Sequence, residues 1–178
     1  MDFFSADHHF FHKKVCELCN RPFANLDEMH AALIKNWNDR VKKTDTVYHL
    51  GDFCFGGHKR AFEIIEQLNG RIYFVPGSHD KWMHGSKWES SKFFILPQLY
   101  SLEYNERGIG GYPLVIVLCH WSMRYWNSSH YPNSFHLYGH SHCNAPPWPK
   151  SMDVGVDCHN YAPISLDEVL AKLVPIVV

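Results

Sequence analysis

Apolar residues recur along the chain with two different spacings, which predict strands and helices in alternation. Runs with the length of buried strands occupy residues 3–6, 46–50 and 71–75. Between them, Asn25 to Arg40 and Lys59 to Asn69 repeat apolar residues with the spacing of an amphipathic helix. Asn25 and Glu28 can form a capping box at the first helix, and Gly70 can end the second. The first half therefore has the alternation of an α/β domain.

Strands dominate the second half. Leu99 to Tyr104 and Leu114 to Cys119 flank a glycine-rich turn, which predicts a hairpin. Further short strands are expected at Phe135 to Tyr138 and Met152 to Val156, and Ser165 to Leu173 has the pattern of a closing helix. These elements together predict an α/β sandwich with helices outside mixed sheets.

Length and charge exclude several classes of protein. With 178 residues, the chain is expected to form one domain over 1–178. Its 17 basic and 18 acidic residues nearly balance, which argues against an extended nucleic-acid surface. The first residues lack the pattern of a secretory signal, and the longest apolar run, Leu114 to Cys119, is too short to span a bilayer. We therefore expect a cytoplasmic protein without a membrane partner.

Six cysteines in a reducing compartment are expected to be small buried hydrophobic residues rather than disulfides. Cys16 and Cys19 form a C-x-x-C pair that could supply half of a zinc site. No second tight pair follows it in the sequence, so a structural zinc site is not favoured.

Residue types that bind metals follow the predicted strands. The clusters are Asp7-His8-His9, Gly51-Asp52, Gly77-Ser78-His79-Asp80, Cys119-His120 and Gly139-His140-Ser141-His142. Because ligand sites form at the carboxyl ends of strands in α/β sheets, these five loops are expected to converge. Mixed carboxylate and imidazole ligands suit manganese, zinc or iron.

The ordered set D-x-H, G-D, a G-N-H-D-like loop, a single His after a strand, and G-H-x-H resembles the signature of the calcineurin-like metallophosphoesterase superfamily. It spans residues 7–142, and the stretches 123–127, 137–142 and 151–157 resemble a small, lid-less branch found in bacteria and phages. The resemblance implies a four-layer αββα sandwich. It also implies a dinuclear-metal-dependent phosphoester hydrolase, with phosphodiesters favoured over phosphomonoesters.

The resemblance assigns roles residue by residue. One divalent ion would be held by Asp7, His9, Asp52 and His142, and a second by Asp52, Ser78, His120 and His140. Manganese is the first expectation for both ions, and zinc, iron and nickel also suit these ligands. A metal-bridging hydroxide would attack phosphorus, His79 would protonate the leaving group, and Asp80 would orient or charge the His79 imidazole.

Ser78 departs from the family pattern, which has Asn at this position. The hydroxyl is a poorer and shorter ligand than an amide carbonyl, which predicts weaker occupancy of the second site and slower turnover. Three explanations stay open: lower activity, natural tolerance through an intervening water, and a deliberate Asn→Ser change.

Several other side chains could contact substrate. His12 and Arg124 could bind a phosphate, although His12 could equally be a solvated loop residue and Arg124 could stack on nearby rings for packing. Trp82, Trp121 and Trp126 could stack on a nucleobase or aryl leaving group, with core packing as the competing use. The expected partner is thus a small phosphoester, nucleotide-like if the rings are used.

Five further residues are expected to have other tasks. Arg21 could bind phosphate, with less support than Arg124. His8 points away from its neighbours Asp7 and His9 by strand alternation, and His49 is expected to be a core histidine. Asp153 and Asp157 are expected to support the fold.

Two functions of other classes stay open at this point. A metal-loaded interaction module with little hydrolysis is compatible with Ser78. A nuclease would use the same metals, but it would need a basic track that the charge balance does not indicate.

Overall fold

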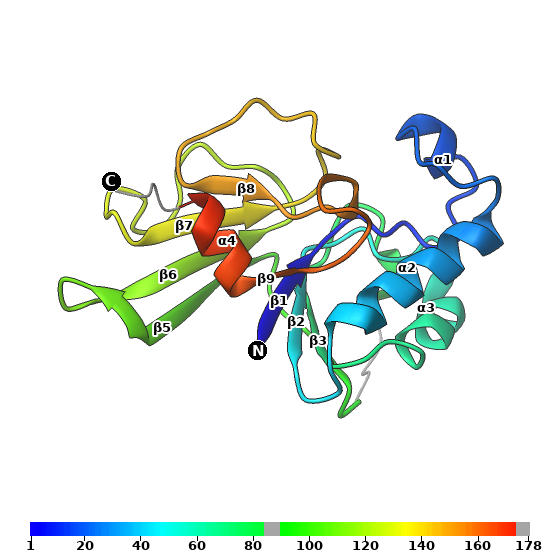
Figure 1. Cartoon of the computed structure of the whole chain (residues 1–178), viewed down its shortest axis with the longest axis horizontal. Coiled ribbons are helices and arrows are strands. Elements are labelled where there is room, and N and C mark those ends of the chain that lie inside the picture. Colours follow the sequence, from blue (N-terminus) through cyan, green and yellow to red (C-terminus); the bar gives the residue numbers. More distant parts are fainter. Residues whose placement is uncertain (84–89, 174–178) are drawn as a thin grey trace.

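The computed structural model describes residues 1–83 and 90–173 and contains two β-sheets packed face to face (Figure 1). The larger sheet, in the order β4-β3-β2-β1-β9, consists of β1 (Asp2–Ser5), β2 (Thr46–His49), β3 (Arg71–Phe74), β4 (Phe93–Ile95) and β9 (Ile164–Ser165). The smaller sheet, in the order β5-β6-β7-β8, consists of β5 (Leu99–Ile109), β6 (Tyr112–Cys119), β7 (Ser134–Tyr138) and β8 (Ser151–Asp153). Strand β9 is antiparallel to β1, and β5 is antiparallel to β6, while the other pairs are parallel. Both sheets are therefore mixed, as predicted.

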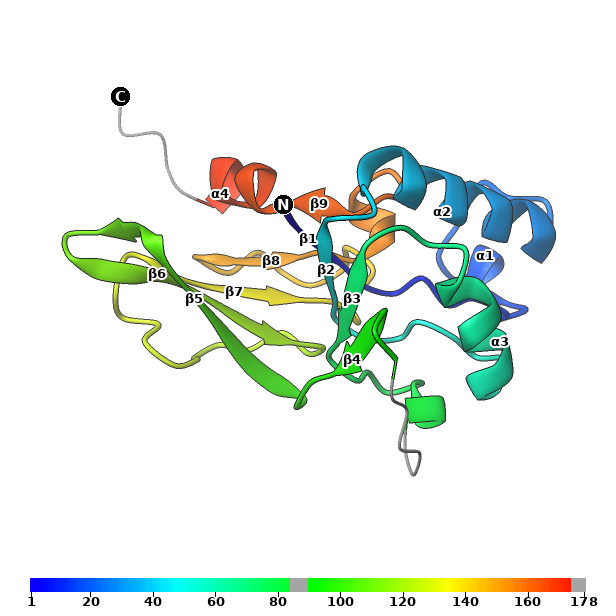
Figure 2. The same ribbon diagram turned by 90° about the horizontal axis from the view of Figure 1, so that it is seen from below.

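The helical elements are α1 (Val15–Leu18), α2 (Leu26–Arg40), α3 (Gly57–Ile65), α4 (Leu166–Leu173) and two short 3-10 turns, η1 (Lys81–Met83) and η2 (Val156–Cys158). Helices α2 and α3 cover the outer face of the larger sheet, whereas α4 lies beside the core between the sheets (Figure 2). The predicted cap of α2 is present, because the Asn25 side chain accepts a hydrogen bond from the backbone N–H of Glu28 at 2.9 Å. Helix α3 begins and ends earlier than predicted, since the chain turns between its last residue, Ile65, and Gly70.

Strand alternation divides the apolar residues between two cores. In β1, Phe3 packs toward the helices with Leu33 and Trp37 of α2, while Phe4 belongs to the core between the sheets. That second core includes Ile116 of β6 and is joined by apolar residues of α4. The predicted α/β sandwich of two mixed sheets is thereby confirmed.

Strand register aligns the loops that carry the metal-binding residue types. Ser5 of β1 pairs with His49 of β2, which pairs with Phe74 of β3, so the three parallel strands end together. In the smaller sheet, Leu118 of β6 pairs with Leu137 of β7 in the same parallel manner. The predicted clusters therefore leave the two sheets at neighbouring edges.

Several elements differ from the sequence-based expectations. Helix α1 and strands β4 and β9 were not predicted, because all three are too short to show a period. Strand β5 continues beyond Tyr104 through an irregularity in its pairing with β6, whereas β8 ends at Asp153, before the predicted Val156.

The expectation that the cysteines avoid disulfides is wrong for one pair. Cys143 and Cys158 form a disulfide with their Cα atoms 5.6 Å apart, because the loop after β7 and η2 lie side by side. Cys54 and Cys119 are free and buried, as expected, and Cys16 and Cys19 are free and half-buried. Within residues 1–83 and 90–173, no helix has the length and apolar character of a membrane span.

Candidate metal centre

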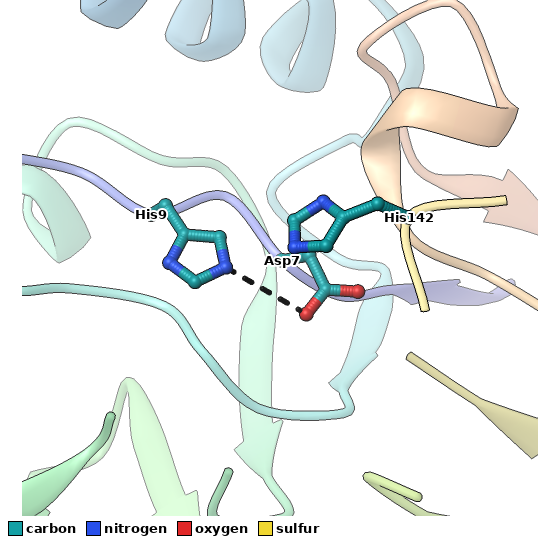
Figure 3. Close-up of side chains that lie close together, drawn as sticks. All are labelled: Asp7, His9 and His142. Atoms are coloured by element: carbon teal, nitrogen blue, oxygen red, sulfur yellow. Dashed lines mark ion pairs between the residues drawn. The ribbon is translucent and has the colours of Figure 1, made fainter. Parts of the chain in front are cut away.

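Asp7, His9 and His142 form the first cluster of potential metal ligands (Figure 3). Asp7 and His9 follow β1, whereas His142 follows β7 of the other sheet. The ligand atoms of the three side chains lie within 4.8 Å of one another, and His9 Nε2 is 4.0 Å from Asp7 Oδ1. Two sheets thus contribute to one group.

Asp52, His120 and His140 form a second cluster with the same spread of at most 4.8 Å. The Oδ2 atom of Asp52 lies 3.4 Å from His120 Nε2 in this cluster and 3.7 Å from His9 Nε2 in the first. One carboxylate oxygen therefore faces both clusters, as a ligand shared by two ions would.

The clusters contain polar atoms that the protein itself leaves unsatisfied. Asp7 Oδ1, His9 Nε2 and His120 Nε2 are buried without a hydrogen-bond partner among the described residues. An unsatisfied buried polar atom costs about 1–3 kcal/mol, so such atoms usually have a function or a ligand. Carboxylate oxygens and imidazole nitrogens are suitable donors for divalent transition metals, and the residues present fit such ions.

Five of the potential ligands have strained backbone conformations. Left-handed φ angles occur at Asp7 (59°), His9 (53°), Asp52 (56°), His140 (68°) and His142 (46°). Each such conformation costs a non-glycine residue about 1–3 kcal/mol and persists where the surroundings enforce it, which is typical of functional sites. The strain turns the ligands out of the strand direction and toward one another.

Burial and neighbouring charges shift the pKa values of the ligands. Burial raises the pKa of Asp7 to about 7 and lowers the pKa of His9 to about 2, so that the imidazole is neutral. Burial also works to raise the pKa of Asp52, but the nearby His120 imidazole outweighs it and holds this pKa well below its usual range. Burial opposes protonation of His120, but Asp52 raises the net pKa of that imidazole.

The ring of His120 is oriented by the backbone. Its Nδ1 atom lies 2.7 Å from the carbonyl oxygen of Leu50, and because that oxygen only accepts, Nδ1–H is the donor. The Nε2 atom is therefore the one presented to Asp52.

Ser78 and His79 lie on the open side of the second cluster. The Ser78 hydroxyl donates to the Asp52 carboxylate, 3.1 Å from Oδ2 and 3.3 Å from Oδ1. The His79 side chain is 45% exposed, and its Nε2 lies 3.9 Å from Asp52 Oδ2. His79 is thus a residue of this loop that a bound substrate could reach.

Asp80 has different partners from the one predicted. Its buried carboxylate accepts hydrogen bonds from the backbone N–H groups of Asp52, Phe53 and Gly77 and from Trp82 Nε1. Within the described residues, the Asp80 carboxylate makes no hydrogen bond to the His79 imidazole, because the Asp80 side chain points inward between the two loops. The predicted orientation of His79 by Asp80 is therefore corrected to a structural role in joining the Asp52 and Gly77 loops.

The two predicted substrate-binding residues differ in position. The His12 ring lies 5.6 Å from the His9 ring and 4.2 Å from the ring of Phe55, so it borders the metal centre. Arg124 places its guanidinium carbon 5.0 Å from the centre of the Trp148 ring, which supports the packing alternative through a ring that was not expected.

The three tryptophans also lie in different environments. Trp82 is buried and donates to Asp80, and Trp126 donates to Ser134 on the smaller sheet, so both have structural tasks. Trp121 is 36% exposed, with its ring 5.1 Å from that of His120. Trp121 is thus the one of the three placed to stack on a ligand at the centre.

His49 lies in the core, as predicted, and His8, whose side chain was expected to point away from Asp7 and His9, lies there too. His8 and His49 are both fully buried, with Nδ1 of the first 2.9 Å from Nε2 of the second. The C-x-x-C pair does not converge on one site, because Cys16 contacts Met29 whereas Cys19 Sγ lies 3.4 Å from His142 Nδ1.

Two residues beside the first cluster have roles other than those expected from the sequence. Asp157 Oδ2 lies 2.7 Å from His142 Nδ1, and Arg21 forms a buried ion pair with Asp157 rather than a phosphate site. The pair is separated by 136 residues, and no local pattern could have joined the two.

Comparison with known proteins gives relatives and a common fold. No family model matches the chain. It is 35% identical over 186 residues, covering 95% of this chain and 88% of the relative, to the uncharacterized protein MJ1445 of Methanocaldococcus jannaschii. The gene 66 protein of Mycobacterium phage L5 is 36% identical over 80 residues, or 43% of this chain and 38% of that protein. The crystal structure of AQ665, a protein of unknown function from Aquifex aeolicus, shares the fold with a TM-score of 0.72 and 24% identity, covering 97% of this chain and 98% of that one.

Proposed function

The chain belongs to the same protein family as MJ1445 of Methanocaldococcus jannaschii, and we propose that it is a dinuclear-metal-dependent phosphoester hydrolase. The observation that carries the proposal is the placement of Asp52 Oδ2 between two ligand clusters, 3.7 Å from His9 Nε2 and 3.4 Å from His120 Nε2. The resemblance of the loops to the calcineurin-like metallophosphoesterases supports the same function.

Asp7, His9 and His142 would hold one ion, and His120 with His140 the other, with Asp52 shared between them. Two such ions, when bound, lower the pKa of a coordinated water toward about 7 and neutralise the charge of a phosphate. Manganese is the first candidate, and zinc, iron and nickel suit the same donors.

His79 is the proposed proton donor to the leaving oxygen. It lies beside Asp52 with its Nε2 3.9 Å from Oδ2, and nearly half of its side chain is exposed. An imidazole in this position can give up a proton as the phosphorus–oxygen bond breaks, which matters most when the leaving group is a poor one.

His12 and Trp121 border the proposed substrate site from opposite ligand clusters. The His12 ring is next to His9, and the Trp121 ring is next to His120. His12 can donate a hydrogen bond to a phosphate oxygen, and Trp121 can stack on an aryl group or a nucleobase. A small phosphodiester with an aromatic substituent is the substrate class that these contacts favour.

The test is hydrolysis of bis(4-nitrophenyl) phosphate by the manganese-loaded protein. Asp52→Asn should reduce turnover by about 10²–10³-fold, because it removes the charge that both clusters share. His130→Gln is the matched control, since His130 is an exposed histidine that packs against the Tyr131 ring. Full manganese occupancy without turnover would instead identify a metal-binding interaction module, and unchanged turnover in Asp52→Asn would contradict the shared-ligand assignment.

The role of His79 is tested with two leaving groups. His79→Asn should keep bound manganese but slow the hydrolysis of an alkyl phosphodiester by about 10²-fold or more, with a smaller effect on the nitrophenyl ester. An equal effect on both esters would count against proton donation by His79.

A further inference from the structure

Arg21 occupies a buried position between the two segments that supply the first ligand cluster. Its Nη2 atom donates to the backbone oxygen of Asp7 at 2.6 Å, and its Nη1 atom donates to the backbone oxygen of His8 at 2.9 Å. The same guanidinium binds Asp157 through two parallel bonds of 2.8 Å each, from Nε and Nη2. One side chain therefore ties the strained segment after β1 to η2.

Asp157 continues this connection to the other side of the cluster. Its Oδ2 atom accepts hydrogen bonds from both Arg21 Nη2 and His142 Nδ1, the latter at 2.7 Å. A carboxylate cannot donate when ionised, so His142 must carry its proton on Nδ1. The Nε2 atom of His142 then presents a lone pair, as metal-bound histidines with a carboxylate partner do.

The second cluster orients its histidine in another way. His120 donates from Nδ1 to the backbone oxygen of Leu50, which side-chain substitution cannot remove. A change at Asp157 would therefore act on the cluster of Asp7, His9 and His142 and leave the cluster of His120 unaltered.

We infer that Asp157 and Arg21 are positioning residues that hold His142 and Asp7 as one unit and thereby set the metal affinity of the first site selectively. The part of this inference that concerns metal rests on the proposed function. The part that concerns the His142 proton does not, because it can be measured in the metal-free protein.

The experiment compares Asp157→Ala, Asp157→Asn and Arg21→Lys with a matched control, Asp45→Asn. Asp45 is also a buried carboxylate, but its partners are the N-terminal amine and the backbone N–H of Lys42, away from the centre. In metal-free protein, the ring nitrogens of His142 are observed by ¹H–¹⁵N NMR and assigned with His142→Gln. In a separate titration, the number of bound manganese ions and their affinities are measured.

Asp157→Ala should move the His142 ring away from the Nδ1–H tautomer. It should also weaken the binding of one manganese ion by about 10–100-fold while the affinity for the other ion is retained. Asp157→Asn should have a smaller effect, because the amide oxygen still accepts from Nδ1–H. Arg21→Lys should leave the tautomer largely unchanged but weaken the binding of the same ion, because an ammonium cannot make the two parallel bonds and hold the Asp7 turn.

The inference is overturned if Asp157→Ala keeps the His142 tautomer and both affinities within about twofold of the wild-type values. It is equally overturned if Asp157→Ala weakens the binding of both ions and Asp45→Asn does the same, which would indicate general destabilisation. Should Asp157→Ala not fold, the same comparison of the His142 tautomer and the manganese affinities is made with Asp157→Asn and Arg21→Lys. Failure of the wild-type protein to bind manganese would refute the proposed function and the metal part of the inference, while the tautomer comparison would still decide whether Asp157 positions His142.

Discussion

The carboxylate of Asp80 accepts a hydrogen bond from the backbone N–H of Asp52 at 2.7 Å. The same Oδ2 atom accepts from the N–H of Gly77 at 3.0 Å, so a buried side chain joins the two loops that form one side of the metal centre. Asp80 is therefore a structural support of the proposed shared ligand.

Asp80→Asn should lower the free energy of unfolding by about 2–4 kcal/mol, because the amide brings N–H groups into a site that is lined by backbone donors. Urea denaturation measures this loss. Asp39→Asn is the control, since Asp39 is exposed and pairs with Lys35 on the surface of α2. If Asp80 instead acted through the His79 imidazole, Asp80→Asn would change the pH profile of turnover while leaving the urea midpoint intact.

Metal affinity should depend on pH through Asp7. Burial raises the pKa of this carboxyl to about 7 in the metal-free protein, so a proton occupies the ligand below that pH. A cation must displace this proton, and His120, whose pKa is also raised, must lose its own, so affinity should fall by at least about tenfold for each pH unit below 7. Manganese titrations at several pH values measure the slope. An affinity that stays constant as the pH is lowered from neutral would contradict the assignment of Asp7 as a ligand.

Ser78→Asn should raise occupancy of the second site and turnover by about 10–100-fold, since the amide oxygen reaches farther and is a better neutral ligand than the hydroxyl. In the present chain the Ser78 hydroxyl donates to Asp52 at 3.1 Å. Ser78→Ala is the matched control, because it removes that bond without adding a ligand and should give no gain. Equal rates in the Asn variant and the wild-type protein would show that Ser78 does not limit the enzyme.

Gly51→Ala should disrupt the centre. Gly51 has a φ of +92°, and a Cβ atom there would lie 2.6 Å from Gly77 Cα and 2.7 Å from His120 Nδ1. We expect a loss of about 3 kcal/mol or more in the free energy of unfolding.

Gly110→Ala provides the comparison, because Gly110 also has a positive φ, +64°, but has open space around its Cα. It should cost only about 1–2 kcal/mol of conformational strain. Thermal unfolding of both variants separates crowding at the centre from backbone strain alone, and equal losses would show that the close approach at Gly51 is unimportant.

The sequence by itself determined most of the longer elements and the residue types of the candidate site. Apolar periodicity located α2 because its buried residues Met29, Leu33 and Trp37 recur on one face. Glycines and metal-binding residue types at the ends of short apolar runs located Asp7, Asp52 and His120, because strand ends are recognisable from local sequence. These features depend on neighbours along the chain.

Tertiary structure decided which distant groups meet. The partners of Asp80, the stacking of Arg124 on Trp148 and the Cys143–Cys158 disulfide all depend on how loops fold over the sheets. The buried pair of Arg21 and Asp157 is the clearest case, since its members are 136 residues apart and have no shared local pattern. Hydrogen bonds and ion pairs act over a few ångströms, and only the packing of the two sheets brings such groups within that range.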